Sequence, residues 1–94
     1  MEVTLNLIPR SPVLLYLQVK VFIKKEILEG RYEKGFQLPP ISRVAKQNSV
    51  STITVRRAYW ELEKEGYITR ERTNAYFVRD RFLLIGQLAD TLAL

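Results

Sequence analysis

The feature that most constrains this fold is a three-residue break, SVS at residues 49–51, between two segments with helical periodicity. The first segment, residues 41–48, has apolar residues three and four positions apart, which indicates about two turns of helix. Ser51 is a good N-cap for a longer helix over residues 52–65, because its hydroxyl can accept from the free amides of the first turn. Gly66 then ends that helix. A short helix, a tight turn and a longer helix together predict a helix-turn-helix motif.

Two β-rich runs follow this motif directly. They are YITRE, residues 67–71, and AYFVR, residues 75–79, and they flank the polar residues 72–74. Two such runs separated by a short polar stretch predict a β-hairpin. A helix-turn-helix followed by a hairpin is the order of elements in a winged helix-turn-helix, in which the hairpin forms the wing.

The remaining segments add elements at both ends of the motif. We expect a short strand at residues 3–8, a helix at residues 13–29 and a very short strand at residues 36–38. Apolar residues of the first helix recur at helical spacing, for example Leu15, Val19, Phe22, Ile23 and Ile27. The charged residues of the first helix are expected on its solvated side: Lys20, Lys24, Lys25 and Glu29. Residues 81–94 place four apolar side chains on one face of a short helix: Leu84, Ile85, Leu88 and Leu92. The expected fold is mainly α with a small β-hairpin wing, a winged helix-turn-helix domain at residues 1–80 plus the short C-terminal helix.

The helix expected over residues 52–65 has one apolar and one polar face. With Val55 pointing inward, the positions three, four and seven residues later share its face. These positions are Ala58, Tyr59 and Leu62. The opposite face holds Ile53, Arg57, Trp60 and Lys64, with Thr52, Thr54 and Arg56 on its flanks. In a helix-turn-helix, the N-terminal part of the second helix reaches base edges in the major groove of DNA.

Side chains at this end of the helix suit contact with DNA. Arg56 or Arg57 can bond two acceptors of a guanine, and Ile53 can cover a thymine methyl. An outward isoleucine beside two arginines is hard to explain by solubility alone. An amphipathic helix that binds nothing also carries arginines on its solvated side, so both interpretations stay open for this segment. Trp60 lies too far along the helix to reach a base, and we expect it to pack on a neighbouring segment or at a subunit contact.

The charge balance favours an anionic partner. Fifteen Lys and Arg against ten Asp and Glu give a formal charge of +5, and the pI is about 9.7. Residues 42–81 hold nine basic and five acidic side chains, so the excess lies mainly in the second half of the chain. A basic domain of this kind is typical of proteins that bind nucleic acid.

Two residue types that carry much of protein chemistry are absent from the sequence. With no cysteine and no histidine, the chain lacks disulfides, thiolate nucleophiles, imidazole bases and the commonest zinc ligands. We therefore expect no catalytic residues, no cofactor, no metal and no enzymatic activity. Apolar stretches fall far short of the roughly 20 residues that span a bilayer. A cytoplasmic protein without a membrane partner is the expectation.

Residues 16–78 resemble the DNA-binding domain of the GntR family of bacterial transcriptional regulators. The resemblance rests on ILEGRY, GFQLPP, SVSTITVRRAYWELEKEGYI and YFV, in this order and at the family's usual spacing, with the block from Thr54 to Gly66 as its strongest part. It implies a homodimeric winged-helix repressor or activator that binds a two-fold symmetric operator. Only sixteen residues follow Val78, which is closest to the short YtrA-like branch, whose helical tails serve mainly for dimerisation. The apolar strip of residues 81–94 would supply that contact, and such a tail cannot enclose a small molecule.

Three features depart from the family's pattern. Ser42 stands where members commonly have a phosphate-binding arginine, and Arg43 follows about 100° further round the helix. Many members also have arginine at the position of Thr52. The glycine-rich tip of the wing is replaced by ERTNA, residues 71–75, in which Asn74 readily takes a left-handed conformation.

The leading hypothesis is a sequence-specific DNA-binding transcriptional regulator, acting as a repressor and as a homodimer on double-stranded DNA. Its expected DNA contacts are the cap and first turns of the 52–65 helix with the basic residues around them: Arg43, Lys46, Ser51, Thr52, Ile53, Thr54, Arg56, Arg57, Arg70 and Arg72. The alternative is a winged helix that binds a protein partner through Ile53, Trp60 and the apolar tail. The missing arginine at Ser42 and the wing without glycine favour this alternative, whereas Arg56, Arg57 and the positive charge oppose it.

Overall fold

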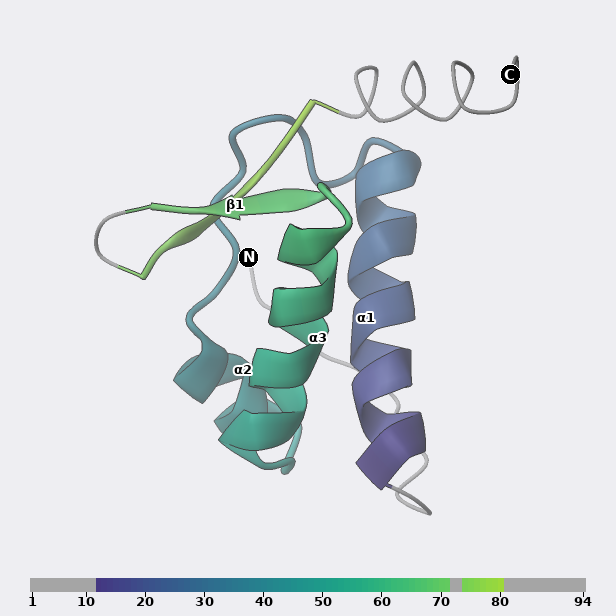
Figure 1. Ribbon diagram of the computed structural model, residues 1–94, viewed down its shortest axis with the longest axis vertical. Coiled ribbons are helices and arrows are strands. Elements are labelled where there is room, and N and C mark those ends of the chain that lie inside the picture. Colours follow the sequence, from purple (N-terminus) through teal and green to yellow (C-terminus); the bar gives the residue numbers. More distant parts are fainter. Residues whose placement is uncertain (1–11, 72–73, 81–94) are drawn as a thin grey trace.

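A computed structural model describes residues 12–71 and 74–80 of the 94-residue chain (Figure 1). Its elements in chain order are α1 (Pro12–Leu28), α2 (Ile41–Gln47), α3 (Thr52–Lys64), β1 (Ile68–Arg70) and β2 (Tyr76–Val78). This arrangement confirms the expected mainly helical fold with a β-hairpin wing, and these five elements lie within a residue of their predicted bounds. The strand expected at residues 3–8 and the helix expected at residues 81–94 lie outside the described residues.

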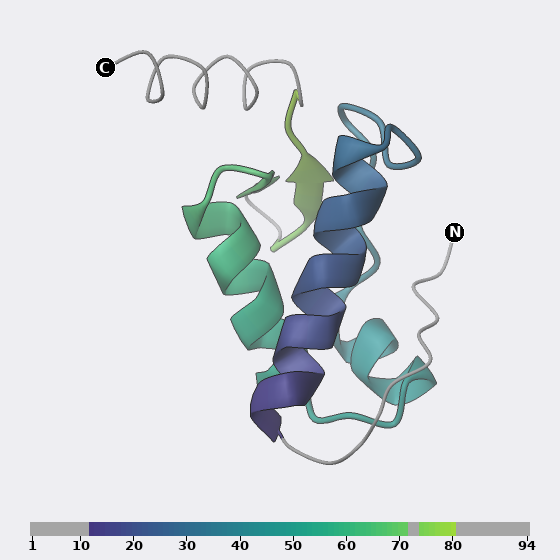
Figure 2. The same cartoon turned by 90° about the vertical axis from the view of Figure 1, so that its right-hand side faces the viewer.

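Helix α1 lies along α3 and supplies one wall of the core (Figures 1 and 2). Val19, Ile23 and Ile27 recur every four residues and are fully buried, as the periodicity predicted. Gly30 ends the helical path with a φ of 82°, and its amide donates to the Ile27 carbonyl at 3.1 Å. Since a positive φ costs glycine little, the chain can turn sharply here towards α2.

The turn between α2 and α3 is closed by main-chain hydrogen bonds. The amide of Val50 donates to the Ala45 carbonyl at 3.0 Å, and the amide of Ser49 donates to the Lys46 carbonyl at 3.4 Å. This pair of bonds is the Schellman arrangement, which needs a left-handed residue just after the helix. Ser49 takes that conformation with a φ of 54°. The turn therefore reverses the chain within three residues and sets the start of α3.

Helix α3 begins at Thr52 because Ser51 caps it. The Ser51 hydroxyl accepts from the Thr54 amide at 3.1 Å, as the sequence predicted for this cap. The inward face of α3 is also as predicted, since its four apolar positions are fully buried: Val55, Ala58, Tyr59 and Leu62. Burial of this face fixes which side chains of α3 point outward.

Tyr59 connects α3 to the segments on either side of it. Its hydroxyl donates to the Pro39 carbonyl at 2.7 Å, and its ring meets that of Tyr76 edge to face, with 5.0 Å between centroids. Burial raises the pKa of Tyr59 well above its usual value, so the hydroxyl remains a donor. The loop before α2 and the wing are thereby held in position against α3.

The wing rests on the core through one face of its hairpin. Strands β1 and β2 are antiparallel, with Ile68 opposite Val78 and both side chains buried. A single bridge between Gln37 and Phe77 lies on the other edge of β2, where a very short strand was expected. At the tip of the wing, Asn74 has a φ of 59°, the left-handed conformation that was predicted for it.

Candidate nucleic-acid interface

The N-terminal half of α3 presents a run of exposed side chains. Thr52 and Arg56 are exposed, and 72% of the surface of Ile53 is accessible. Ile53 and Arg56 are three residues apart, so they lie on the same side of the helix. A single exposed isoleucine is ordinary on a protein surface, so the relevant feature of Ile53 is its position beside Arg56 at the start of α3.

Thr54 does not lie on an exposed flank, and that expectation is wrong. The Thr54 side chain is buried, and its hydroxyl lies 2.9 Å from the Ser51 hydroxyl oxygen, the same atom that accepts the Thr54 amide. Hydroxyls at the start of a helix commonly satisfy its free amides in this way. Ser51 and Thr54 therefore hold the N-terminus of α3 in shape, and the exposed side chains beside them are left for a ligand.

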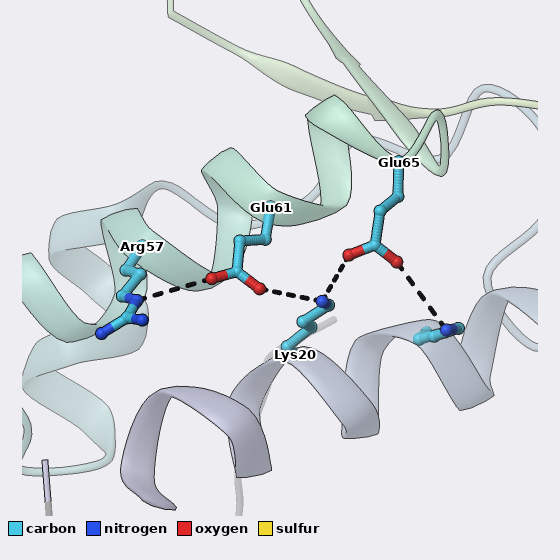
Figure 3. Close-up of polar contacts among 5 residues, drawn as sticks. Lys20, Arg57, Glu61 and Glu65 are labelled. Carbon is cyan, nitrogen blue, oxygen red and sulfur yellow. Dashed lines mark hydrogen bonds and ion pairs between the residues drawn. The ribbon is translucent and has the colours of Figure 1, made fainter. Parts of the chain in front are cut away.

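The two adjacent arginines of α3 have different surroundings. Arg57 lies against α1, with its guanidinium carbon 3.8 Å from the centroid of the Tyr16 ring and its Nε 3.4 Å from Glu61 Oε2. Figure 3 shows the Arg57 side chain directed towards Glu61. Arg56 lines a groove elsewhere on α3 and makes no ion pair within residues 12–71 and 74–80. Glu61 follows Arg57 by four residues on the same helix, whereas Tyr16 becomes a neighbour of Arg57 only when α1 packs on α3.

Glu61 extends this contact into a charged network between α1 and α3 (Figure 3). Lys20 Nζ donates to Glu61 Oε1 at 2.9 Å and also contacts Glu65, while Lys24 Nζ lies 3.8 Å from Glu65 Oε1. The hydrogen bond from Lys20 lowers the pKa of Glu61, and the bonds to Glu61 and Glu65 raise the pKa of Lys20. The side chain of Lys20 is only 15% exposed, so its predicted place on the solvated side of α1 is wrong.

Other basic residues that were predicted to contact DNA surround α3. Arg43 and Lys46 are exposed on α2, and Arg70 is exposed at the end of β1. None of the three makes an ion pair with another residue that the structure describes. Their charges are therefore available to phosphates. Arg72 lies outside the described residues, as do the predicted dimerisation residues Leu84, Ile85, Leu88 and Leu92.

An open groove of about 630 Å³ separates α3 from the wing and the start of α2. Nine residues line this groove: Pro40, Ile41, Ser42, Arg56, Trp60, Glu63, Arg70, Asn74 and Tyr76. Trp60 is 56% exposed, and the Lys64 ammonium lies 5.0 Å from the centroid of its ring. Two contacts were expected for Trp60, with a neighbouring segment or with a second subunit. Within the described residues Trp60 does not pack on a neighbouring segment, so the first expectation is wrong. Sequence reasoning missed the groove because its walls come from three separate segments.

The three helices, the tight turn and the hairpin define a winged helix-turn-helix domain. Residues 15–78 match the family described as "Bacterial regulatory proteins, gntR family". The chain therefore belongs to the GntR family of bacterial transcriptional regulators, as its resemblance implied.

Two curated relatives come from Bacillus subtilis (strain 168). The transcriptional regulator YhdI is 36% identical over 80 residues, which are 85% of this chain and 17% of YhdI. The transcriptional repressor NagR is 31% identical over 74 residues, which are 79% of this chain and 30% of NagR. The chain thus spans less than a third of the length of these relatives.

Two solved structures share the fold over most of the chain. YtrA from Sulfolobus acidocaldarius, a GntR-family transcription factor, is 28% identical with a TM-score of 0.72, covering 97% of this chain and 82% of YtrA. The AraR DNA-binding domain in complex with operator ORX1 is 26% identical with a TM-score of 0.67, covering 82% of this chain and 95% of that domain. In the part of this chain that the structure describes, no helix has the length and apolar character needed to cross a membrane.

Proposed function

We propose that this chain is a sequence-specific DNA-binding regulator that acts as a homodimeric repressor on a two-fold symmetric operator. The observation that carries the proposal is the exposed start of α3, where Thr52, Ile53 and Arg56 project from a helix whose opposite face is fully buried. A rigid helix tip that carries such side chains can enter the major groove of DNA.

Each group at this tip matches a feature of DNA. The Arg56 guanidinium offers two parallel donors to the O6 and N7 acceptors of guanine, and Ile53 offers an apolar contact to a thymine methyl. Arg43, Lys46 and Arg70 would hold the phosphates on either side, which positions the domain without reading sequence. Arg72 would add a phosphate or minor-groove contact at the tip of the wing.

Repression and dimerisation are supported by the relatives and by the chain's apolar end. NagR is named a repressor, and the AraR domain is in complex with an operator. A repressor blocks transcription by occupying DNA, which needs binding but no further chemistry. Dimers of helix-turn-helix proteins bind two half-sites about one helical turn apart. The apolar strip of residues 81–94 would join two copies in this way.

The salt dependence of binding tests the proposal. The full chain is titrated with a duplex from its own promoter and with random duplex between 50 and 200 mM salt, and we expect affinity to fall by roughly a hundredfold or more, because protein cations release condensed counterions. Replacement of Lys46 by alanine should reduce the slope of log K against log salt by about 1. No binding to either duplex even at low salt would refute a DNA-binding function.

The alternative of a protein-binding module rests on the exposed apolar side chains of α3. Ile53 is 72% exposed and Trp60 is 56% exposed, and exposed apolar side chains of this kind also occur on protein interfaces. Under this alternative, Ile53→Ser would abolish partner binding, whereas Arg43→Ala would leave partner binding unchanged. If the chain binds DNA as proposed, Arg43→Ala should lower DNA affinity because it removes a phosphate contact. A loss of DNA affinity on Arg43→Ala therefore separates the two functions.

A further inference from the structure

The groove between α3 and the wing has walls of mixed chemistry. One side carries Arg56, the half-exposed ring of Trp60 and Glu63, and the other side carries Arg70 and Asn74. We propose that this groove holds the sugar-phosphate backbone of one DNA strand, with the Trp60 ring packed on a deoxyribose and Arg70 at a phosphate. This inference rests on the proposed DNA-binding function. It extends that function to a backbone contact at Trp60 and Arg70, which does not read bases.

The position of Trp60 along α3 agrees with a contact to the backbone. Trp60 follows Thr52 by eight residues, which corresponds to about 12 Å along the helix axis. The major groove is about 8.5 Å deep. When Thr52 and Ile53 lie at the base edges and α3 enters the groove end on, Trp60 therefore lies near the rim of the groove, where the sugars and phosphates are.

The wing places a second set of groups across from Trp60. Arg70 ends β1 and Asn74 lies at the tip of the hairpin, and both line the groove opposite α3. Figure 1 shows the hairpin projecting sideways past α3. In duplex DNA a single sugar-phosphate strand separates the major groove from the adjacent minor groove. With α3 in the major groove and the wing at the minor groove, this strand must pass between Trp60 and Arg70.

The charges of the groove favour DNA over a protein segment. Arg56 and Arg70 line it, and Lys64 Nζ lies 5.0 Å from the Trp60 ring, against the single carboxylate of Glu63. A polyanion with apolar sugar faces matches this pattern, since Arg70 and Lys64 meet phosphates, the indole meets a deoxyribose, and Arg56 at the inner end of the groove reaches the bases. An apolar peptide would leave these cations without partners, and a second copy of the chain carries a net charge of +5 itself.

The chain contains a single tryptophan beside five tyrosines, so fluorescence excited selectively at tryptophan reports on Trp60 alone. The full chain is titrated with random duplex at low salt, and acrylamide quenching of Trp60 is measured in parallel with the anisotropy of labelled DNA. We expect saturating DNA to reduce quenching, because the backbone covers the ring. Unchanged quenching while anisotropy shows binding would overturn the proposal. Quenching that falls with protein concentration in the absence of DNA would place a second copy in the groove and also overturn it.

Three variants separate a backbone contact from a base contact. Trp60→Ala should weaken binding by about fivefold to tenfold, the value expected for the apolar area of one partly covered ring, and equally on promoter and random duplex. It should leave the salt slope unchanged, whereas Arg70→Ala should lower that slope by about 1. Trp60→Phe should recover most of the lost affinity, and unfolding curves of all three variants check that each is folded.

Val21 offers a matched control, because it is 58% exposed on α1 and lines no part of the groove. Val21→Ala should leave DNA affinity unchanged. A loss on Trp60→Ala that is confined to the promoter duplex would make Trp60 a base contact, and no loss on either duplex would remove it from the interface. Failure of the unaltered chain to bind any duplex would instead refute the proposed function, so the two outcomes are distinguishable.

Discussion

Arg56 and Arg57 are neighbours in the sequence, yet only Arg57 has an ion pair or a ring contact with another residue that the structure describes. Arg57 contacts the Tyr16 ring and Glu61, while Arg56 lines the groove beside the helix tip. An arginine that is already held by an aromatic ring and a carboxylate must give up these contacts to reach a base. We therefore expect Arg56 to read DNA sequence and Arg57 to hold α3 against α1.

This difference predicts opposite behaviour of the two alanine variants. Arg56→Ala should lower affinity for the promoter site by about 1 to 3 kcal/mol and affect random DNA much less, as expected for a guanine contact. Arg57→Ala should affect both duplexes alike and also lower the midpoint of urea unfolding. Anisotropy titrations and urea curves measure these effects, with Arg79→Ala as the control for loss of one exposed positive charge. Equal loss on both duplexes for Arg56→Ala would make Arg56 a phosphate contact.

Ser49 offers a prediction about stability at one backbone position. Its φ of 54° lies in the left-handed region, which costs an L-residue about 1 to 2 kcal/mol and costs glycine little. Ser49→Gly should stabilise the fold by about 1 kcal/mol, because the extra chain entropy of glycine in the unfolded state offsets only part of the gain. The melting temperature should then rise by a few degrees.

A second serine in the same turn provides the control for this prediction. Ser51 has a φ of −73° and caps α3, so Ser51→Ala should lower stability by about 1 kcal/mol. Thermal unfolding followed by circular dichroism compares both variants with the unaltered chain. A lower melting temperature for Ser49→Gly would show that the serine side chain stabilises the turn in a way that its backbone conformation does not reveal.

Local sequence rules correctly predicted those structural features that depend on one residue and its neighbours along the chain. The cap at Ser51 and the left-handed Asn74 were predicted for that reason, and both are present. Thr54 was assigned wrongly because helical spacing gives only an angle, whereas its burial depends on the hydroxyl contact with Ser51. The contact of Arg57 with the Tyr16 ring is between helices, and the sequence of α3 alone does not contain it.

The packing of α1 on α3 combines an apolar seam with a charged network. Val19, Ile23 and Ile27 supply the buried part, and Lys20 with Glu61 and Glu65 supplies the polar edge. The sequence predicted the apolar seam, since helical periodicity identifies it directly. It did not predict the network, because a lysine at the edge of an apolar face looks the same as a solvated one until the facing helix is known.

The network predicts how stability depends on pH. The pKa of Glu61 is lowered, so its contribution is present above the pKa of the unfolded chain, near 4.3, and is lost as pH falls through the folded value. The pKa of Lys20 is raised, so its contribution is complete below the unfolded value near 10.4 and is lost as pH rises through the folded value. The stabilisation should be constant between about pH 5 and 10.

Urea unfolding at pH 7 and at pH 3 to 4 measures the acidic side of this dependence. Lys20→Met removes the main cause of the lowered Glu61 pKa, so this variant should lose less stability on acidification than the unaltered chain. Lys34→Met is the matched control, because Lys34 is an exposed lysine outside the network. An identical acid dependence for the unaltered chain and Lys20→Met would show that the network does not couple to folding.

Across the whole described domain, basic residues differ in what they contact. Lys20 and Arg57 are paired with carboxylates at the α1 side of α3. Arg43, Arg56 and Arg70 line or flank the other side and make no ion pair within the described ranges. A net charge of +5 alone does not identify a binding face. The unpaired arginines on α2, α3 and the wing support the proposed DNA-binding surface, although exposed Lys25 and Lys34 elsewhere also make no ion pair with a described residue.

The last prediction concerns assembly of two copies through residues 81–94. Four apolar residues on one face of the expected helix should join two chains, so deletion after Asp80 should shift the protein towards monomer in sedimentation. Affinity for a two-fold site should fall at the same time, because linked half-site contacts become independent ones. Leu88→Asn should act like the deletion, whereas Asp90→Asn, which lies on the opposite side of the expected helix, should not. An unchanged dimer after deletion would assign dimerisation to the rest of the chain, and the two-fold operator would then be read through a different contact.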